Sequence, residues 1–180
     1  LLIRAGWLAR CKNHQNQPST DASLNLYDPM CGSGTFLIEA AMMALDIAPG
    51  SFREYLGVFG WRQFSQDMWE KTKENSKKRF QSNQNKEVLR IMGSDINPKA
   101  VTLAVSNIEF FDEFDLSSYI QINIAGIDQI EQLCIAQNGL LIVNPPYSER
   151  LGDFDQVKNL YGELGTILKA HFTGWNASVL

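Results

Sequence analysis

The sequence predicts an α/β fold, in which a mostly parallel β-sheet has helices on both of its faces. Two observations predict this fold. Short apolar runs bounded by turn residues alternate with longer segments whose apolar residues recur at helical spacing. The residues best suited to bind a ligand directly follow the apolar runs, and parallel sheets bind ligands at the carboxyl ends of their strands.

The apolar runs that we expect to form strands are residues 24–27, 88–92, 119–124, 139–143 and 176–180, the last of which looks cut off. Residues 35–45, rich in Ala, Leu and Met, are expected to form the first helix of the sheet. Asn97 and Pro98 resemble an N-cap followed by proline at the first helical position, and apolar spacing continues that helix to Ile108. A further helix is expected around residues 157–168. Residues 1–10 are expected to be the end of a helix that closes at residues 5–7.

The composition indicates one domain of a larger intracellular protein. The 180 residues carry 16 Lys and Arg against 20 Asp and Glu, whereas a domain that grips RNA phosphates unaided usually has a basic excess. Most contacts with nucleic acid are therefore expected in another part of the protein. The three cysteines form no CxxC pair and the histidines are isolated, so we expect no disulfide, no metal and a cytoplasmic location. No apolar run reaches the length of a membrane span, and residues 1–10 are no signal peptide.

Residues 46–86 interrupt the alternation as an aromatic-rich insertion. Six large aromatic residues lie close together in it: Phe52, Tyr55, Phe59, Trp61, Phe64 and Trp69. Residues 67–84 are polar and partly basic. We interpret the segment as an insertion with a solvated helix, whose aromatic residues pack on the core because they are costly to leave in water. The alternative is an RNA-contacting face with stacking aromatics.

The first candidate site follows the first strand. It consists of Asp28, Pro29, Met30, Cys31, Gly32, Ser33, Gly34 and Thr35. Its glycines allow a tight turn and a close approach to a ligand, and the following helix offers free N–H groups at its N-terminus. It lacks the patterns of phosphate-binding and dinucleotide-binding loops. An acidic first residue suits a cofactor with a cationic amino-acid end, such as S-adenosylmethionine. A plain strand-to-helix turn capped by Asp28 explains the loop equally well.

The second candidate site ends the second strand, in Gly93-Ser94-Asp95-Ile96-Asn97. Here the Asp95 carboxylate can accept hydrogen bonds from both hydroxyls of a ribose, as the acidic residue of dinucleotide-binding folds does. Ile96 is assigned to the same cofactor site. The alternative is that Asp95 only caps the next helix, but Asn97 can fill that role without it.

The third candidate site, Asn144-Pro145-Pro146-Tyr147, directly follows the apolar run at 139–143. The two prolines fix the backbone and remove N–H donors, which leaves the Pro145 carbonyl as a bare acceptor. The Asn144 side-chain oxygen is a second acceptor, and together they can hold both hydrogens of a planar amino group. Tyr147 offers a flat face for the ring that bears this amine. The alternative is a rigid turn that caps a buried strand.

With these three motifs in order, the sequence resembles the Rossmann-like (class I) amino-methyltransferases, whose signature is Asn-Pro-Pro-Tyr after the fourth strand. Residues 28–35 with 38–41 (IEAA) are similar to the THUMP-linked guanine methyltransferases. The segments 47–50 (IAPG), 144–152 (NPPYSERLG) and 174–176 (GWN) are similar to the bacterial 23S rRNA guanine-N2-methyltransferases of the L type. The resemblance runs over nearly the whole chain, including the insertion.

The resemblance implies a catalytic methyltransferase domain over residues 1–180, with S-adenosylmethionine as donor and the 2-amino group of a ribosomal RNA guanine as acceptor. It also implies a seven-stranded sheet whose final strands, like an N-terminal RNA-binding THUMP domain, are missing here. The family usually has an aspartate at the end of the third strand, near the adenine of the cofactor. Gly126 stands at that position, and Asp128 is the candidate substitute.

Four alternatives stay open: a tRNA guanine methyltransferase, a DNA adenine amino-methyltransferase, a protein glutamine methyltransferase, and a silent domain that only binds RNA or protein. Residues 28–35 and 47–50 argue against the adenine and glutamine enzymes. The complete set of three motifs argues against the silent domain.

Overall fold

The computed structural model describes residues 1–16, 23–133, 136, 138–146 and 154–180. Its main elements are α1 (Trp7–Asn16), β1 (Leu24–Asp28), α2 (Thr35–Leu45), α3 (Gln66–Gln81), β2 (Leu89–Asp95), α4 (Pro98–Glu109), β3 (Ile120–Ile124), β4 (Leu140–Val143), α6 (Phe154–His171) and β5 (Asn176–Val179). Short 3-10 segments include η1 (Gly57–Gly60), η2 (Gln84–Glu87) and η5 (Ile127–Gln132). The five expected strands are confirmed, as are the helices expected after the first, second and fourth strands.

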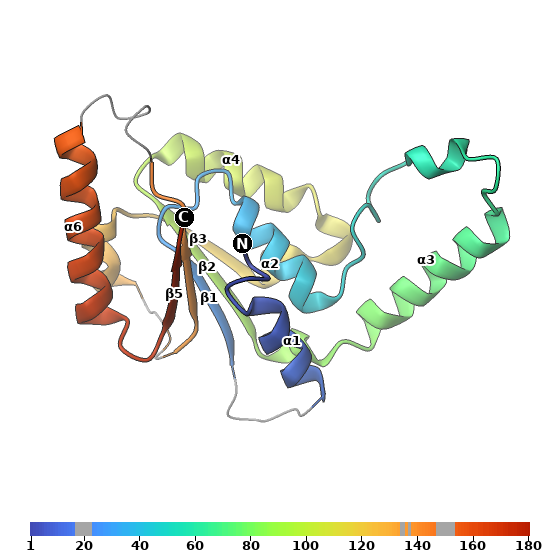
Figure 1. Cartoon of the computed structure of the whole chain (residues 1–180), viewed down its shortest axis with the longest axis horizontal. Coiled ribbons are helices and arrows are strands. Elements are labelled where there is room, and N and C mark those ends of the chain that lie inside the picture. Colours follow the sequence, from blue (N-terminus) through green and yellow to red (C-terminus); the bar gives the residue numbers. More distant parts are fainter. Residues whose placement is uncertain (17–22, 134–135, 137, 147–153) are drawn as a thin grey trace.

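The five strands form one parallel sheet in the order β3-β2-β1-β4-β5. The chain therefore runs outward from β1 to β3 and then crosses back to place β4 on the other side of β1. Helices α1, α2 and α4 lie on one side of the sheet and α6 on the other (Figure 1). This is the predicted Rossmann-like α/β fold. The carboxyl ends of β1 and β4 meet where the strand order reverses, which is where such sheets bind ligands.

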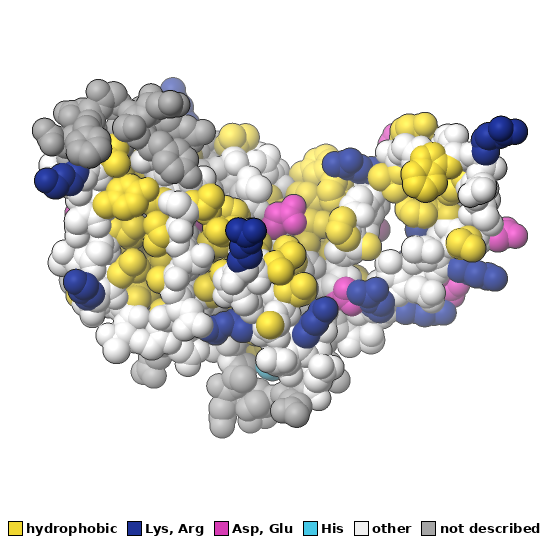
Figure 2. Space-filling model, viewed as in Figure 1, with side chains coloured by type: hydrophobic (Ala, Val, Ile, Leu, Met, Phe, Trp, Pro, Cys, Tyr) yellow, Lys and Arg dark blue, Asp and Glu magenta, His cyan; other side chains and the backbone are white. Residues whose placement is uncertain are grey.

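The insertion projects from the core as an arm, which we define as residues 52–81 (Figures 1 and 2). Its helix α3 buries no residue, so the expected solvated helix is confirmed. The expected packing of the aromatic residues on the core is wrong for the outer part of the arm. There Phe59 packs against Tyr55, Phe64 and Trp69, with ring centroids 5.2–5.7 Å apart. Phe59, Phe64 and Trp69 are half-buried in this local cluster, which partly offsets the cost of leaving the core, whereas Tyr55 stays 70% exposed.

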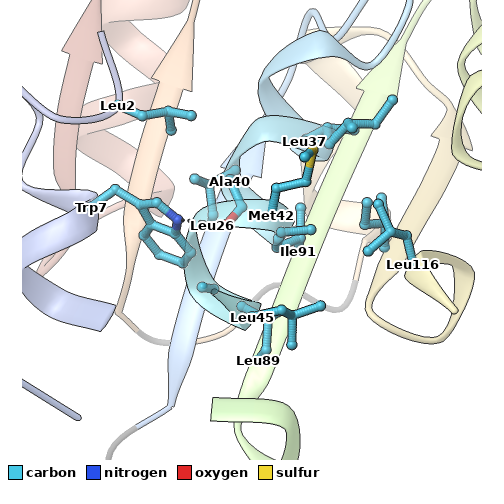
Figure 3. Close-up of a cluster of buried hydrophobic side chains, with 14 of the residues drawn as sticks. Leu2, Trp7, Leu26, Leu37, Ala40, Met42, Leu45, Leu89, Ile91 and Leu116 are labelled. Carbon is cyan, nitrogen blue, oxygen red and sulfur yellow. Dashed lines mark hydrogen bonds between the residues drawn. The ribbon is translucent and has the colours of Figure 1, made fainter. Parts of the chain in front are cut away.

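The main hydrophobic core fills the space between the sheet and helices α1, α2 and α4 (Figure 3). Helix α2 is hydrophobic on most of its surface, and seven of its 11 residues are buried. A helix of this composition needs to be covered on several sides, and α1 and the sheet cover it. Trp7 of α1 is fully buried and donates its indole N–H to the carbonyl of Ala40 at 2.9 Å. The loop of residues 28–35, which we call the glycine loop, thus leads into a helix that is largely buried.

A second core lies on the opposite face of the sheet, under α6 and η5. Tyr27, Leu141 and Val143 point into it from β1 and β4 and are fully buried. The ring of Tyr27 stacks on Phe172 with centroids 5.8 Å apart and an interplanar angle of 9°. Burial on both faces explains why β4 reads as a continuous apolar run.

The N-terminal segment differs from the expectation, because residues 1–10 do not end a helix. A turn leads into α1, which begins at Trp7 directly after Gly6 with its φ of +83°. The buried residues of α1 are Trp7, Cys11 and His14, at positions i, i+4 and i+7. This stripe has helical spacing, but one of its three members is His14, which an apolar pattern does not count.

Two buried asparagines anchor the return of the arm to the core. Asn83 donates to the carbonyl of Ala44 at 3.0 Å, and Asn85 donates to Ala44 at 2.8 Å and to Cys11 at 3.2 Å. The Asn85 side-chain oxygen pairs with Nδ1 of His14 at 2.9 Å. These asparagines tie η2 to the last turn of α2 and to α1.

Within the described ranges no helix is long and apolar enough to cross a membrane. The described His, Cys, Asp and Glu side chains form no group of three or more that could hold a metal ion.

Candidate functional site

The loop between β1 and α2 has a backbone fixed by glycine geometry. Gly32 and Gly34 have φ angles of +55° and +78°, in the left-handed region that favours glycine. The N–H of Gly34 donates to the carbonyl of Cys31 at 2.9 Å, which closes the turn. No side chain caps α2, whose N-cap is Gly34. Its first N–H groups, which lack partners inside the helix, are therefore available to a ligand.

The same loop is tied to the end of β2. The N–H of Cys31 donates to the carbonyl of Ser94, and the N–H of Gly32 donates to Oδ2 of Asp95, both at 2.9 Å. Ser94 makes two further contacts with this region. Its hydroxyl pairs with the hydroxyl of Tyr27 at 2.7 Å and lies 3.4 Å from the carbonyl of Pro29. The first and second predicted motifs thus form one unit.

Asp28 lies beneath the loop rather than at its surface. Its side chain is 1% exposed, and Oδ1 accepts a hydrogen bond from the N–H of Met30 at 3.0 Å. Burial raises the pKa of Asp28 to about 7, the charge of Asp95 adds to the rise, and the bond from Met30 opposes it. Asp28 therefore does not present its carboxyl group at the surface of the loop, where we expected it to suit the cationic end of a cofactor. Asp28 shapes the loop through its bond to Met30, and its raised pKa keeps the carboxyl largely protonated below about pH 7.

Cys31 is buried beside these carboxylates and contributes packing rather than reactivity. Burial raises the pKa of its thiol to about 12, and the negative charges of Asp28 and Asp95 raise it further. A thiol that stays protonated is a poor nucleophile.

Gly93, in β2, allows α2 to lie close against the strand. A Cβ at this position would overlap Leu37 of α2 and would lie 3.1 Å from Cβ of Cys31. The sequence predicts Gly93 only as part of the second motif. A glycine inside an apolar strand is the pattern that marks such a close approach.

Asp95 ends β2 with its carboxylate half-exposed. Oδ1 accepts the N–H of Asn97 and Oδ2 accepts the N–H of Gly32, both at 2.9 Å. An ionised carboxylate has about four acceptor positions, so capacity remains for hydroxyl donors. Asn97 caps α4, as predicted, by accepting the N–H of Lys99 at 3.0 Å. The next side chain, Ile96, is 76% exposed and offers an apolar surface beside the carboxylate.

The end of β3 brings Asp128 to the position of Gly126. The N–H of Ala125 donates to the carbonyl of Asp95 at 3.1 Å, which places this turn beside the second motif. A Cβ built on Gly126 would overlap the carboxylate of Asp128 and would lie 3.4 Å from the side chain of Ile96. The Asp128 carboxylate therefore occupies the space that a side chain at position 126 would fill.

The third motif follows β4, which is buried along its whole length. Asn144 is exposed, Pro145 is buried and Pro146 is half-buried, while Tyr147 lies outside the described residues. Because Leu26 and Tyr27 of β1 pair with Leu140 and Leu141 of β4, Asn144 emerges beside the loop that begins at Asp28. The strand order thus brings all three motifs to one edge of the sheet.

Asn107 is a site residue that sequence reasoning missed. From α4 it donates its side-chain N–H to the carbonyl of Ser33 at 2.9 Å, and Ser33 in turn pairs with the hydroxyl of Thr35 at 3.2 Å. Asn107 thus fixes the outer part of the glycine loop. An asparagine in an amphipathic helix looks like any solvated polar residue, so the sequence carries no pattern that singles it out.

The comparisons with known proteins agree with this geometry. The "Ribosomal RNA large subunit methyltransferase K/L" of Methylococcus capsulatus is 39% identical over the whole chain, which spans 22% of that relative's length. Among solved structures, a "possible methylase" from Clostridium difficile 630 matches with a TM-score of 0.74 and 31% identity, over 98% of this chain and 42% of the other. SMU.472, solved as a complex with SAH, matches with a TM-score of 0.72 and 26% identity, over 99% and 46% of the two chains.

A family model described as "RMKL-like, methyltransferase domain" matches residues 16–180. This match covers the sheet, the arm and all three motifs. The chain therefore belongs to the RMKL-like family of methyltransferase domains.

Proposed function

We propose that this domain binds S-adenosylmethionine at the carboxyl edge of its sheet and methylates the exocyclic 2-amino group of a guanine in large-subunit ribosomal RNA. One observation carries the proposal. The glycine loop is hydrogen-bonded to Asp95 through Gly32, and Asn144 and Pro145 follow the neighbouring strand β4. The proposed cofactor site and the proposed amine-holding site would thus be neighbours.

The residues present fit this cofactor. Space is open over Gly32, where a Cβ would meet no atom within 4 Å. Asp95 keeps acceptor capacity for the two ribose hydroxyls, and the exposed side chain of Ile96 gives an apolar face for an adenine. The Asp128 carboxylate, beside Ile96, is a candidate acceptor for the adenine amino group. The remaining residues of the proposed contact surface are Pro29, Met30, Cys31, Ser33, Gly34 and Thr35, with Asp28 beneath them.

When bound, S-adenosylmethionine supplies an electrophilic methyl group on a sulfonium. The task left to the chain is to orient the acceptor amine. Asn144 and the Pro145 carbonyl accept its two hydrogens, which turns the nitrogen lone pair out of conjugation with the ring. Pro145 and Pro146 keep these acceptors rigid because their rings fix the backbone. Tyr147 is proposed to stack on the guanine.

Proton balance places few demands on the domain. The carbon–sulfur bond would break as the nitrogen–carbon bond forms, with S-adenosylhomocysteine as the leaving group. The surplus proton of the amine would pass to solvent, because the amide oxygens of Asn144 and Pro145 orient the amine but are too weakly basic to keep its proton. Orientation of the reactants then supplies much of the rate, about 7–11 kcal/mol for well-placed groups. A base stacked in a helix is out of reach, so the target guanine must be unpaired or flipped out.

One observation supports ribosomal RNA as the substrate. The relative from Methylococcus capsulatus bears an rRNA methyltransferase name, and the match covers every part of this chain. The acidic balance of the chain, 16 basic against 20 acidic residues, favours further RNA contacts by another domain. We propose that an N-terminal THUMP domain provides them and that the protein acts in the cytoplasm.

Two measurements test the proposal on the natural full-length protein. Calorimetry with S-adenosylmethionine reports cofactor binding, and transfer of labelled methyl to unmodified large-subunit RNA reports catalysis. Nucleoside analysis of the product should show N2-methylguanosine. Methylation of adenine at N6, or of a protein glutamine, would assign the domain to one of the alternative classes. Binding of neither the cofactor nor RNA would contradict the proposal altogether.

A further inference from the structure

The arm keeps large aromatic side chains in solvent although an aromatic cluster lies next to them. Tyr55 is 70% exposed and Trp61 is 69% exposed. The backbone at Trp61 is nevertheless fixed, because its N–H donates to Val58 at 3.1 Å and its carbonyl accepts from Phe64 at 3.0 Å. The rings are thus presented on an ordered turn. Such an exposed apolar surface is typical of an interaction site.

The arm is also the basic part of an acidic chain. Residues 53–81 contain seven Lys and Arg against four Asp and Glu, whereas the rest of the chain has nine against 16. Lys73, Lys78 and Arg79 are engaged in ion pairs with Glu70, Glu74 and Asp46. Within the described part of the chain, four basic residues of the arm form no ion pair: Arg53, Arg62, Lys71 and Lys77. Their charge is therefore available to an anionic partner.

The position of the arm suits a substrate contact. A 16-residue helix such as α3 is about 24 Å long, so it carries the tip of the arm well beyond the core. In Figure 1 the tip, around η1, lies on the same side of the molecule as the carboxyl ends of the strands. Figure 2 shows hydrophobic and Lys or Arg side chains together on the arm, across a notch from the core.

From these observations we propose that the arm is an RNA-docking surface, an inference that rests on the proposed function. Tyr55 and Trp61 stack on unpaired bases of the RNA near the target guanine. Arg53, Arg62, Lys71 and Lys77 bind the adjoining phosphates. Flat rings among cations are the usual composition of surfaces that hold single-stranded nucleic acid.

A protein partner fits the arm less well. The centre of a protein–protein interface is depleted of charged residues, and lysine is depleted across it. On α3 the lysines are interspersed with the exposed Met68 and with Trp69, and no part of the helix surface forms a broad apolar patch free of charge. A single-stranded nucleic acid offers phosphates to the basic side chains and flat bases to the aromatic rings.

Four double variants of the natural full-length protein test the inference; one of them, Tyr55→Phe with Trp61→Phe, keeps an aromatic ring at both positions. Tyr55→Ala with Trp61→Ala removes the exposed rings, and Lys71→Glu with Lys77→Glu reverses charges on α3. Lys158→Glu with Lys169→Glu makes the same charge change on α6, at the opposite end of the molecule from the arm in Figure 1. The probe is an unmodified large-subunit ribosomal RNA transcript. For each variant we would measure the RNA dissociation constant at several salt concentrations, cofactor affinity and the midpoint of thermal unfolding.

Loss of the two rings should weaken RNA binding about tenfold or more without changing its salt dependence, since each stacked base accounts for about five- to 150-fold in affinity. The charge reversal on α3 should weaken binding and lower the salt slope by about 0.9 for each phosphate that the variant no longer binds. The α6 variant should bind within about twofold of the wild type. Tyr55→Phe with Trp61→Phe should restore most of the affinity, because stacking needs only the rings.

Cofactor affinity and the unfolding midpoint should stay unchanged in all variants, which separates docking from folding. The inference would be overturned if both the variant without the two rings and the variant with reversed charges on α3 bound RNA at the wild-type level. A change of sedimentation coefficient at unchanged RNA affinity would assign the arm to a protein contact and would also overturn it. A wild-type protein that binds the RNA but transfers no methyl would contradict the proposed function and leave the docking surface standing.

Discussion

The carboxylate of Asp95 accepts the backbone N–H of Gly32 at 2.9 Å, across the boundary between two predicted motifs. Its other oxygen accepts the N–H of Asn97. Asp95 therefore holds the glycine loop in place while it faces the proposed ribose site. On the sequence alone its charge looked dispensable for folding, because Asn97 caps α4. The bond to Gly32 changes that expectation.

Asp95→Ala should weaken S-adenosylmethionine binding at least tenfold, or about 1.4 kcal/mol. It should also lower the free energy of unfolding by about 1–3 kcal/mol, because two backbone donors lose a charged acceptor. Calorimetry and denaturant unfolding measure the two effects. Glu109→Ala, which removes an exposed acid from α4, serves as the control. Unchanged cofactor affinity in a folded Asp95→Ala variant would remove Asp95 from the site.

Asn144→Ala should separate binding from chemistry. Cofactor affinity should stay near the wild-type value, because Asn144 is proposed to contact only the acceptor amine. Methyl transfer should fall by about 100-fold or more, since small misplacements at a reacting centre have effects of that size. Single-turnover transfer to unmodified RNA measures the step. Transfer at the wild-type rate would contradict the amino-methyltransferase mechanism.

The raised pKa of Asp28 makes the stability of the cofactor-free domain dependent on pH. The usual pKa of 3.8 rises to about 7 on folding, chiefly through burial. Between these values the folded state keeps a proton that the unfolded state has lost, so the free energy of unfolding falls as pH rises from about 4 to 7. Asp28→Asn cannot ionise but still offers an oxygen to Met30.

Relative to that of the wild type, the free energy of unfolding of Asp28→Asn should therefore rise by at least about 1.4 kcal/mol between pH 4 and pH 8. This difference is the equivalent of one pKa unit. Denaturant unfolding at several pH values measures the difference. Parallel pH profiles for the two proteins would show that Asp28 is ionised in the folded state.

Gly93→Ala and Gly165→Ala form a matched pair. The Cβ at position 93 would overlap Leu37 and crowd Cys31, so this variant should lose about 1–3 kcal/mol of stability. At position 165, within α6, a Cβ would meet no atom within 4 Å. Alanine there should add about 0.5–1 kcal/mol, because it restricts the unfolded chain and favours the helix. Thermal unfolding compares the two, and equal midpoints would contradict the close packing of α2 on β2.

The sequence patterns located the strands and most helices because a strand buried on both faces, such as β4, is a continuous apolar run, and a helix that covers the sheet carries apolar residues at helical spacing. They failed where contacts depend on the partner. Trp7, Cys11 and His14 line a buried face of α1, and Nδ1 of His14 pairs with Asn85, which lies far along the chain. For the arm, the number of aromatic residues was informative, but their mutual packing was not deducible from the sequence.

The candidate site shows the same division. Glycine and proline patterns place the three motifs at strand ends, and parallel pairing brings them to one edge. The burial of Asp28, the bond from Asn107 and the overlap of Asp128 with the space above Gly126 depend on how the folded segments pack against one another. No local sequence pattern encodes this packing.

The anchoring of the arm has a consequence for how this family can diversify. Asn83 and Asn85 both donate to the carbonyl of Ala44, so the excursion that leaves the end of α2 returns to the residue next to its point of departure. A segment whose ends are held together can be lengthened, shortened or exchanged without shifting the register of β2 against β1. Under the docking role proposed for the arm, exchange of its tip would change the contact with the substrate and leave the carboxyl edge of the sheet as it is.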